Sequence, residues 1–225
     1  MSPVNKILEV RRLGLVPYEE GLALQRDLVE ARRRDEIPDT LLLLQHPPVI
    51  TLGVKVRSDR SHILATPEGL VARGVTVHES GRGGDVTFHG PGQLVGYPIF
   101  DLNPDRRDLH RYVRDIEESL IRALAGFEVR AGRVQGLTGV WVGEEKVAAI
   151  GVRISRWITS HGFALNVDPD LGFFDLIVPC GIADRGVTSM ARLLGRPVAV
   201  EEVEVPVAQA FAEVFCLSFA FRPIA

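Results

Sequence analysis

The clearest pattern in the chain is a run of apolar residues at helical spacing near its middle. Within residues 108–127, leucine, isoleucine and valine recur three or four positions apart, which predicts an amphipathic helix. A second helix is predicted over 17–34, because proline and two glutamates suit its first turn and three arginines suit its last. The sequence also predicts a last helix over 201–216 and a short helix within 184–195.

Buried strands are predicted where short apolar or alternating runs lie between turn residues. They cover residues 7–13, 40–44, 49–53, 74–80, 93–100 and 157–168. Residues 137–155 alternate on both sides of Gly143-Glu144-Glu145, which is the pattern of a β-hairpin. Strands and helices follow one another without regular alternation, and no linker or repeat divides the chain. We therefore predict one α+β domain over residues 1–225, with a central mixed, largely antiparallel sheet flanked by helices.

Composition and charge narrow the class of protein. Of the 225 residues, 46% are hydrophobic and 24% are charged, which is typical of a globular domain. A formal net charge of −3 lacks the basic excess of a nucleic-acid binder. The chain has no apolar run of 18 residues and no apolar leader near its start, so we expect no membrane association and a cytoplasmic location.

Residues 81–94 form the most unusual stretch, with five glycines, one proline, one arginine and one histidine. Glycines at this density expose backbone N–H groups and let a ligand approach the main chain, as an anion cradle or oxyanion site requires. The spacing fits no standard nucleotide-binding motif, so an irregular surface loop is the plainer interpretation. Arg82 beside Gly83-Gly84 favours a ligand site, because a planar cation next to backbone amides suits a phosphate or carboxylate.

The two cysteines differ in their surroundings. Cys180 is flanked by Pro179 and Gly181 after an apolar run, so a turn could present its sulfur to a cleft. Most lone cysteines do no chemistry, and a structural role for Cys180 stays open. Cys216 lies among large apolar residues, where we expect a buried, inert thiol.

Lysine is rare in the chain, which has only Lys6, Lys55 and Lys146 against twenty-three arginines. Lys146 follows the predicted hairpin turn, where a lysine is ordinarily solvated and pairs with Glu144 or Glu145. Arginine keeps its proton, whereas a lysine in a partly buried site can release it. Proton transfer by Lys146 is therefore the alternative interpretation, although the other two lysines stand in places with no evident chemistry.

Metal and serine-hydrolase chemistry find no support in the sequence. The six histidines show no metal-ligand spacing, and Ser80 does not complete a nucleophile-elbow motif. His89 and His161 each precede a glycine, and either could line a pocket or form hydrogen bonds in a turn.

Three segments together, residues 82–94, 145–167 and 179–182, resemble the octanoyltransferases, the lipoate-protein ligase B family. Their order and approximate spacing both agree, and residues 41–53 add to the likeness, which extends over about residues 8–195. The resemblance implies a fold similar to the catalytic domains of biotin and lipoate protein ligases.

The resemblance also implies a reaction, in which octanoyl moves from acyl carrier protein to a lysine ε-amine. The acceptors would be lipoyl domains of 2-oxoacid dehydrogenase complexes and the glycine cleavage H protein, and no ATP or metal cofactor would be needed. By position, Cys180 would be the acyl-accepting nucleophile and Lys146 its partner. The segments implied to bind substrate comprise Arg82, Gly83, Gly84, Asp85, Val86, Thr87, Phe88, His89, Ala149, Ile150, Gly151, Gly162, Phe163 and Ala164.

These roles agree with simple chemistry. A free thiol of pKa about 8.5 is mostly protonated at neutral pH, and a neighbouring ammonium favours the reactive thiolate. We expect backbone N–H groups near Gly83-Gly84 to hold the oxyanion that forms when the thiolate attacks. The same lysine could then take the proton of the incoming amine.

Acidic partners would favour a basic surface near the cleft. The candidate arginines are Arg32, Arg33, Arg34, Arg106, Arg107, Arg111, Arg114, Arg153 and Arg156, although arginines on helix faces are often merely solvated. The sequence leaves two other functions open. One is an ATP-dependent lipoate or biotin ligase, which would not need Cys180, and the other is a non-catalytic module that binds acyl groups or carrier protein.

Overall fold

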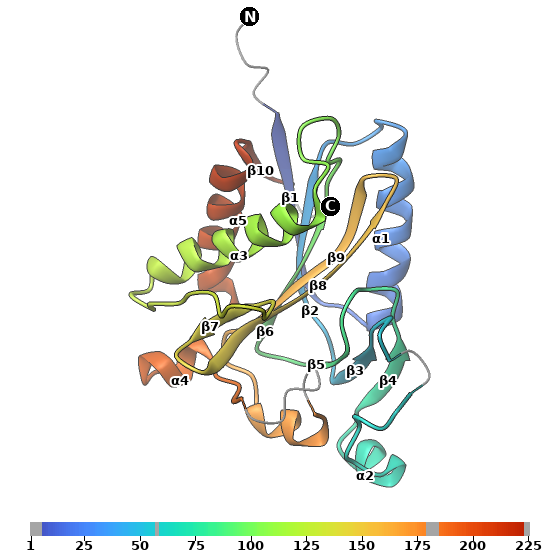
Figure 1. Cartoon of the computed structure of the whole chain (residues 1–225), viewed down its shortest axis with the longest axis vertical. Coiled ribbons are helices and arrows are strands. Elements are labelled where there is room, and N and C mark those ends of the chain that lie inside the picture. The colour runs from blue at the N-terminus through green and yellow to red at the C-terminus, as the bar shows by residue number, and fades with distance from the viewer. Residues whose placement is uncertain (1–5, 57–58, 179–184, 223–225) are drawn as a thin grey trace, which may run out of the picture.

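A computed structural model of the chain describes residues 6–56, 59–178 and 185–222. Its main feature is a seven-stranded sheet (Figure 1). In spatial order the strands are β10 (Ser218–Phe221), β1 (Ile7–Leu15), β2 (Thr40–Gln45), β6 (Gln93–Ile99), β9 (Ile158–Asn166), β8 (Glu145–Ser155) and β7 (Val140–Val142). The first three are parallel, and every later neighbour is antiparallel. The predicted mixed, largely antiparallel sheet is confirmed.

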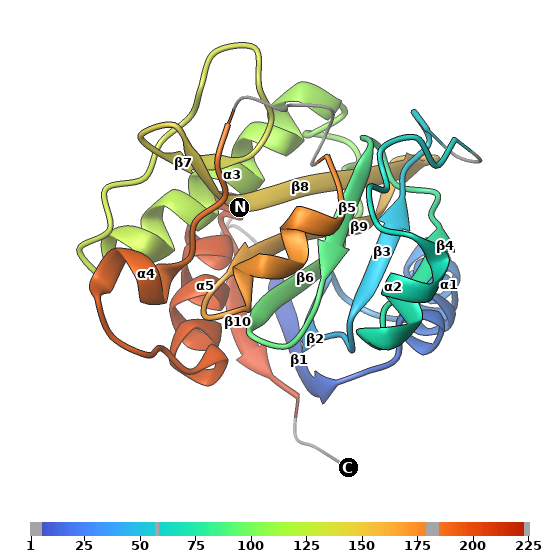
Figure 2. The ribbon, with the colours of Figure 1, turned by 90° about the horizontal axis from the view of Figure 1, so that it is seen from below.

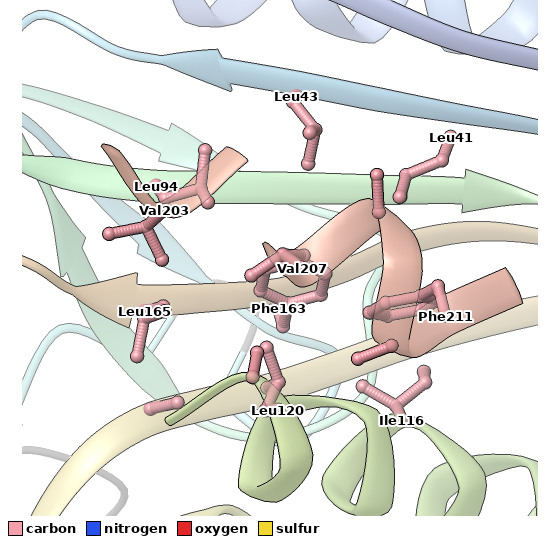
Figure 3. Close-up of a cluster of buried hydrophobic side chains, with 14 of the residues drawn as sticks. Leu41, Leu43, Leu94, Ile116, Leu120, Phe163, Leu165, Val203, Val207 and Phe211 are labelled. Atoms are coloured by element: carbon pink, nitrogen blue, oxygen red, sulfur yellow. The ribbon is translucent and has the colours of Figure 1, made fainter. Parts of the chain in front are cut away.

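Helices cover both faces of this sheet. Helices α3 (Leu109–Ala125) and α5 (Val200–Phe215) pack on one face, where alternate strand residues such as Leu41 and Leu43 join the main core (Figure 3). The residues between them, Leu42 and Leu44, point to the other face and pack with helix α1 (Tyr18–Arg33). Both faces of β2 are therefore buried, which explains its unbroken run of leucines.

A second, three-stranded sheet lies beside the first, and the sequence did not predict it as a separate layer. It consists of β4 (Thr76–Glu79), β3 (Val49–Leu52) and β5 (Val86–His89). Helix α2 (Pro67–Ala72) and the 3₁₀ helix η1 (Leu171–Leu176) complete its small core. Figure 2 shows α2, β3, β4 and β5 grouped on one side of the molecule, away from α3.

The helices predicted over 17–34, 108–127 and 201–216 are confirmed as α1, α3 and α5, and the short one is α4 (Met190–Leu194). The predicted hairpin is confirmed as β7 and β8. The irregular loop over 81–94 is wrong in part, because residues 86–89 form the fully buried strand β5. The terminal strand β10 and helix α2 went unpredicted. Within the described part of the chain, every helix is too short or too polar to span a bilayer.

Candidate active site

Two neighbouring strands of the large sheet place small residues on one face. In the register of β8 and β9, Ala149 pairs with Ala164 and Gly151 pairs with Gly162. Alanine and glycine have little or no side chain, so these residues leave space above this face of the sheet. A cleft lies there, and residues of both strands line it.

The opposite wall of the cleft comes from the small sheet and the glycine-rich segment. Strand β5 alternates, so Thr87 and His89 line the cleft while Val86 and Phe88 point into the core of the small sheet. The predicted site residues that line the cleft are Arg82, Gly84, Asp85, Thr87, His89, Ala149, Ile150, Gly151, Gly162, Phe163 and Ala164. The side chains of Val86 and Phe88 are not brought to it.

Close approach of the two walls requires glycine. A Cβ atom at Gly151 would lie 2.8 Å from the carbonyl oxygen of Gly83 and 3.1 Å from Cδ of Arg82. A Cβ atom at Gly53 would lie 2.3 Å from the carbonyl oxygen of Gly84. The glycine-rich segment therefore packs directly against strand backbone, with no room for side chains between.

Arg82 is fixed by the small sheet. Its Nη2 donates to the Thr51 carbonyl oxygen at 2.7 Å and to Thr51 Oγ1 at 2.9 Å, and Nη1 donates to the Gly83 carbonyl oxygen at 3.1 Å. The guanidinium is buried. These contacts hold the segment in place and set the charge beside the cleft.

Of the Gly83-Gly84 region expected to hold the oxyanion, the Gly83 amide is already engaged, and the role of the Gly84 amide stays a prediction. The Gly83 N–H donates to the carbonyl oxygen of Val152 at 2.9 Å, so strand β8 already occupies this donor. Gly83 instead joins the glycine-rich segment to the large sheet, and it is absent from the cleft wall.

Lys146 lies in a second, smaller cavity that adjoins the cleft. The two cavities share Thr87, Ala149 and Ala164. Lys146 is 9% exposed, and its Nζ lies 4.8 Å from the centroid of the Trp141 ring. The interpretation of Lys146 as a solvated hairpin residue is therefore wrong. We call this cavity the lysine chamber.

Cys180 lies outside the described residues. The described residues on both sides of it reach the lysine chamber, because Phe174 of η1 and Val187 line its wall. The backbone N–H of Lys146 also donates to the Gly186 carbonyl oxygen at 2.9 Å.

The expectation that Cys216 is buried is wrong. Cys216 is exposed and ends helix α5 in the left-handed conformation, at φ 57°. The helix ends at Phe215, so the apolar run that suggested burial continues into a turn.

Aromatic and histidine rings close the part of the cleft farthest from the lysine chamber. Tyr18, Tyr97 and His161 line it together with His89, which is also hydrogen-bonded to Gln93 of the chamber. The rings of Tyr18 and His89 stack with centroids 6.5 Å apart. Sequence reasoning missed both tyrosines, since each occupies an apolar position of α1 or β6 and no local signal separates them from core residues. We call Tyr18, His89, Tyr97 and His161 the polar end wall.

Hydrogen bonds fix the proton positions behind this wall. His46 Nδ1 lies 2.6 Å from the Val16 carbonyl oxygen, which can only accept, so Nδ1 donates. Burial lowers the pKa of His46 to about 4, so its ring is neutral and Nε2 accepts. The Tyr97 hydroxyl, 2.7 Å away, therefore donates to Nε2 and keeps its own lone pairs as acceptors.

The same reasoning fixes His89. Its Nδ1 lies 3.2 Å from Oε1 of Gln93, whose Nε2 donates to Asn166 Oδ1 and to the Phe88 carbonyl oxygen. Burial, aided by His46 and Arg82, keeps the pKa of His89 well below its ordinary value. The ring is neutral, Nδ1 donates and Nε2 is an acceptor.

His161 is the third neutral imidazole of the site. Burial, followed by the charges of Arg82 and Arg153, lowers its pKa to about 4. Its backbone has φ 56°, and its N–H donates to Oε1 of Gln25 at 2.7 Å. Among the described residues, no three histidine, cysteine, aspartate or glutamate side chains gather as metal ligands would.

The candidate docking arginines are largely engaged with carboxylates. The pairs are Arg32 with Asp35 and Asp39, Arg33 with Glu30, Arg34 with Glu36, Arg106 with Asp115 and Arg114 with Glu117. Arg153 and Arg156 are exposed on the β8–β9 hairpin. The arginines on the helices are therefore mostly paired with nearby carboxylates rather than gathered as a basic patch.

Comparison with known proteins agrees with this architecture. A family model described as the lipoyl protein ligase A/B catalytic domain matches residues 17–212. A solved structure of a bi-partite lipoate protein ligase and its E2 lipoyl domain from Thermoplasma acidophilum shares the fold, with TM-score 0.73 and 18% identity over 98% of this chain and 88% of that one. The fold and the match define a catalytic domain of the lipoyl protein ligase class.

Closer relatives specify the branch of this class. An octanoyltransferase from Chloroflexus aurantiacus is 55% identical over 94% of this chain and 96% of its own length. An octanoyltransferase from Myxococcus xanthus is 53% identical over 92% of this chain, which spans 59% of that relative's length. The chain belongs to the octanoyltransferase family, as the sequence motifs predicted.

Proposed function

We propose that this protein transfers an octanoyl group from acyl carrier protein to a lysine of a lipoyl domain, as a step of lipoate biosynthesis. Membership of the octanoyltransferase family supports the reaction class. The observation that carries the proposal is the cleft over β8 and β9, because small residues floor it and a buried lysine lies at one end. Small, largely apolar residues along the floor suit an alkyl chain.

The position of the lysine chamber suggests how the substrate lies. Thr87, Ala149 and Ala164 belong to both cavities, so an acyl chain in the cleft would have its carbonyl end near Lys146. The chain would then run along β8 and β9 toward the polar end wall. The acyl carbonyl could therefore react near Lys146 while the alkyl chain stays buried in the cleft.

Cys180 is the proposed nucleophile. It precedes Gly186 by six residues, a length that reaches at most about 20 Å, and Gly186 is hydrogen-bonded to Lys146. Phe174, six residues before Cys180, also lines the chamber. This proximity supports a Cys180–Lys146 dyad.

The proposed reaction balances with these two groups. The Cys180 thiolate attacks the thioester carbon, a new S–C bond forms, and the carrier thiolate leaves with a proton from the Lys146 ammonium. The substrate amine then attacks the acyl-cysteine, the S–C bond breaks, and the amine proton passes to neutral Lys146. The thioester is already activated, so the proposal requires neither ATP nor metal.

Acyl carrier protein and lipoyl domains, including the glycine cleavage H protein, are the proposed partners. A cytoplasmic site of action also forms part of the proposal, since the mechanism needs a reduced thiol. The exposed Arg153 and Arg156 on the β8–β9 hairpin stay candidates for contact with acidic partners.

Intact-mass analysis with octanoyl-carrier protein tests the proposed function. The experiment uses the Cys216→Ser variant, because the exposed Cys216 could otherwise also carry an adduct. Any adduct then lies on Cys180. We expect an octanoyl adduct on Cys180 that forms without ATP and is lost when a lipoyl domain is added. A requirement for ATP would instead favour a ligase. Binding of the carrier with no adduct would favour a non-catalytic module.

Lys146 variants test the dyad. In the same background, Lys146→Ala should slow alkylation of Cys180 near neutral pH, because less thiolate forms. Lys146→Arg should retain alkylation but lose transfer, because arginine keeps its proton. Equal alkylation rates in the parent and in Lys146→Ala would contradict the activation of Cys180 by Lys146.

A further inference from the structure

The cleft and the lysine chamber meet at three residues. Thr87, Ala149 and Ala164 line both cavities, so the junction between the cavities lies at these side chains. With the alkyl chain in the cleft and Lys146 in the chamber, the proposed function puts the acyl carbonyl at this junction. A thioester carbonyl under attack develops negative charge on its oxygen, and a hydrogen-bond donor placed there stabilises the transition state.

Of the three junction residues, Thr87 is the one whose side chain can donate. Ala149 and Ala164 have no polar side-chain atom, and they pair with each other between β8 and β9. Thr87 belongs to β5, whose alternation turns its side chain toward the cleft. The Thr87 hydroxyl is therefore placed where the carbonyl oxygen of a bound acyl group would lie.

The Thr87 hydroxyl is available to a ligand. Thr87 is 8% exposed, and its side chain makes no hydrogen bond with the described residues. The unpartnered polar side-chain atoms that are sealed from solvent belong to other residues, so the Thr87 oxygen keeps accessible surface. Because Thr87 lines the cleft and the chamber, this surface opens on the junction.

Two neighbouring donors are already engaged. Nε2 of Gln93, a residue of the chamber, donates to Asn166 Oδ1 at 3.0 Å and to the Phe88 carbonyl oxygen at 3.2 Å, which uses both of its protons. The Gly83 N–H donates to strand β8. Neither group can also donate to a substrate oxygen, whereas Thr87 can.

A fixed positive charge lies on the same face of the small sheet. Thr51 of β3 lies directly opposite Thr87, and Thr51 Oγ1 accepts from Arg82 Nη2 at 2.9 Å and from Arg82 Nε at 3.2 Å. Side chains at opposite positions of paired strands have Cβ atoms about 5 Å apart. The buried guanidinium is therefore close to Thr87 and favours negative charge on an oxygen bound there.

We propose that Thr87 is a catalytic residue of the acyl transfer, whose hydroxyl donates a hydrogen bond to the acyl carbonyl oxygen. When the Cys180 thiolate adds to the carbonyl carbon, the C=O π electrons move to this oxygen and the hydrogen bond strengthens. When the bond from carbon to the carrier sulfur breaks, the electrons return and the C=O bond is restored. Thr87 keeps its proton throughout, and Lys146 moves the protons. The inference rests on the proposed function, since it takes the acyl carbonyl to lie at the junction.

Thr87→Val tests this role, because valine has nearly the shape of threonine and lacks the hydroxyl. We expect kcat for octanoyl transfer to fall about 10²- to 10³-fold, while KM for octanoyl-carrier protein changes less than about threefold. Thr87→Ser keeps a hydroxyl and should retain at least about a tenth of the parent kcat. A fall of less than about tenfold in Thr87→Val, or equal falls in the two variants, overturns the inference.

Alkylation of Cys180 separates this catalytic role from a structural one. A thiolate displaces iodide from iodoacetamide without forming a carbonyl oxyanion, so the rate reports the thiolate and its access alone. In the Cys216→Ser background, Thr87→Val should be alkylated at the parent rate but acylated more slowly by octanoyl-carrier protein. Parallel falls in alkylation and acylation would show a disturbed site and contradict the role of Thr87.

Thr40→Val is the matched control. Thr40 is also a buried threonine of a strand, β2, but it lines neither cavity, and its hydroxyl donates to the Pro38 carbonyl oxygen at 3.0 Å. The ratio of the acylation rate to the alkylation rate should stay at the parent value in Thr40→Val. The same fall of this ratio in Thr40→Val and Thr87→Val would refute a specific contact of Thr87 with the substrate.

Failure of this inference differs from failure of the proposed function. Octanoyl transfer by the parent protein that persists in Thr87→Val refutes the role of Thr87 alone. Absence of octanoyl transfer by the folded, unmodified protein refutes the proposed function and, with it, the inference.

Discussion

Replacing Gly151 with alanine tests the close packing on which the cleft depends. The new Cβ would lie 2.8 Å from the carbonyl oxygen of Gly83, 3.1 Å from Cδ and 3.5 Å from Nη1 of Arg82. The nearest of these atoms belongs to backbone, so the glycine-rich segment must shift. Overpacking of this kind costs about 1–3 kcal/mol of the free energy of unfolding.

Gly132→Ala is the matched control. Gly132 pairs with Trp141 in a short bridge, and a Cβ there would meet nothing within 4 Å. Both substitutions reduce the entropy of the unfolded chain to the same extent, about 0.4–1 kcal/mol, so their difference isolates the clash.

Thermal unfolding measures that difference. For a domain of this size 1 kcal/mol corresponds to about 2–4 °C, so Gly151→Ala should melt about 2–12 °C below Gly132→Ala. The rate of octanoyl transfer should also fall in Gly151→Ala, because Arg82 and the cleft wall move with the segment. Equal melting temperatures in the two variants would refute the contact between the glycine-rich segment and β8.

Three further predictions concern buried charge, pH and thiol exposure. Glu117→Ala should lower the free energy of unfolding, measured in urea, by about 3–5 kcal/mol, because the buried carboxylate accepts from two arginines and a backbone N–H. Glu118→Ala is the control and should cost under about 1 kcal/mol. His46 and His161 have pKa values of about 4 when folded, so stability should fall as pH drops from about 6.5 toward 4, by about 3 kcal/mol for each. Imidazole NMR titration checks this, and midpoints above pH 6 would contradict it. Cys216 should react with iodoacetamide in the native protein, as peptide mapping would show, and protection from the reagent would contradict its exposure.

Local periodicity accounts for the elements that the sequence predicted well. Helix α3 follows from its apolar spacing. Asp108 caps its first turn, where the side chain accepts a hydrogen bond from the Arg111 N–H. The hairpin of β7 and β8 follows from alternation around Gly143, whose φ is 59°. These signals lie within a few residues of one another, so they need no knowledge of the rest of the chain.

The errors came from regions whose environment is set by distant residues. The glycines around strand β5 favour a loop, but pairing with β3 makes residues 86–89 a strand. Cys216 lies in an apolar run, yet the end of α5 turns it outward. Composition alone does not say which face of a segment the fold will cover.

The sequence by itself determined the fold class, the principal helices, the family and most of the residues along the cleft, because periodicity and motif spacing are local. Only the tertiary structure brought the two walls of the cleft close together, placed the lysine chamber beside the cleft and assembled the polar end wall. Tyr18, His89, Tyr97 and His161 come from four elements, α1, β5, β6 and β9. Their proximity follows from sheet register and from the approach of one sheet to the other, and local sequence carries neither.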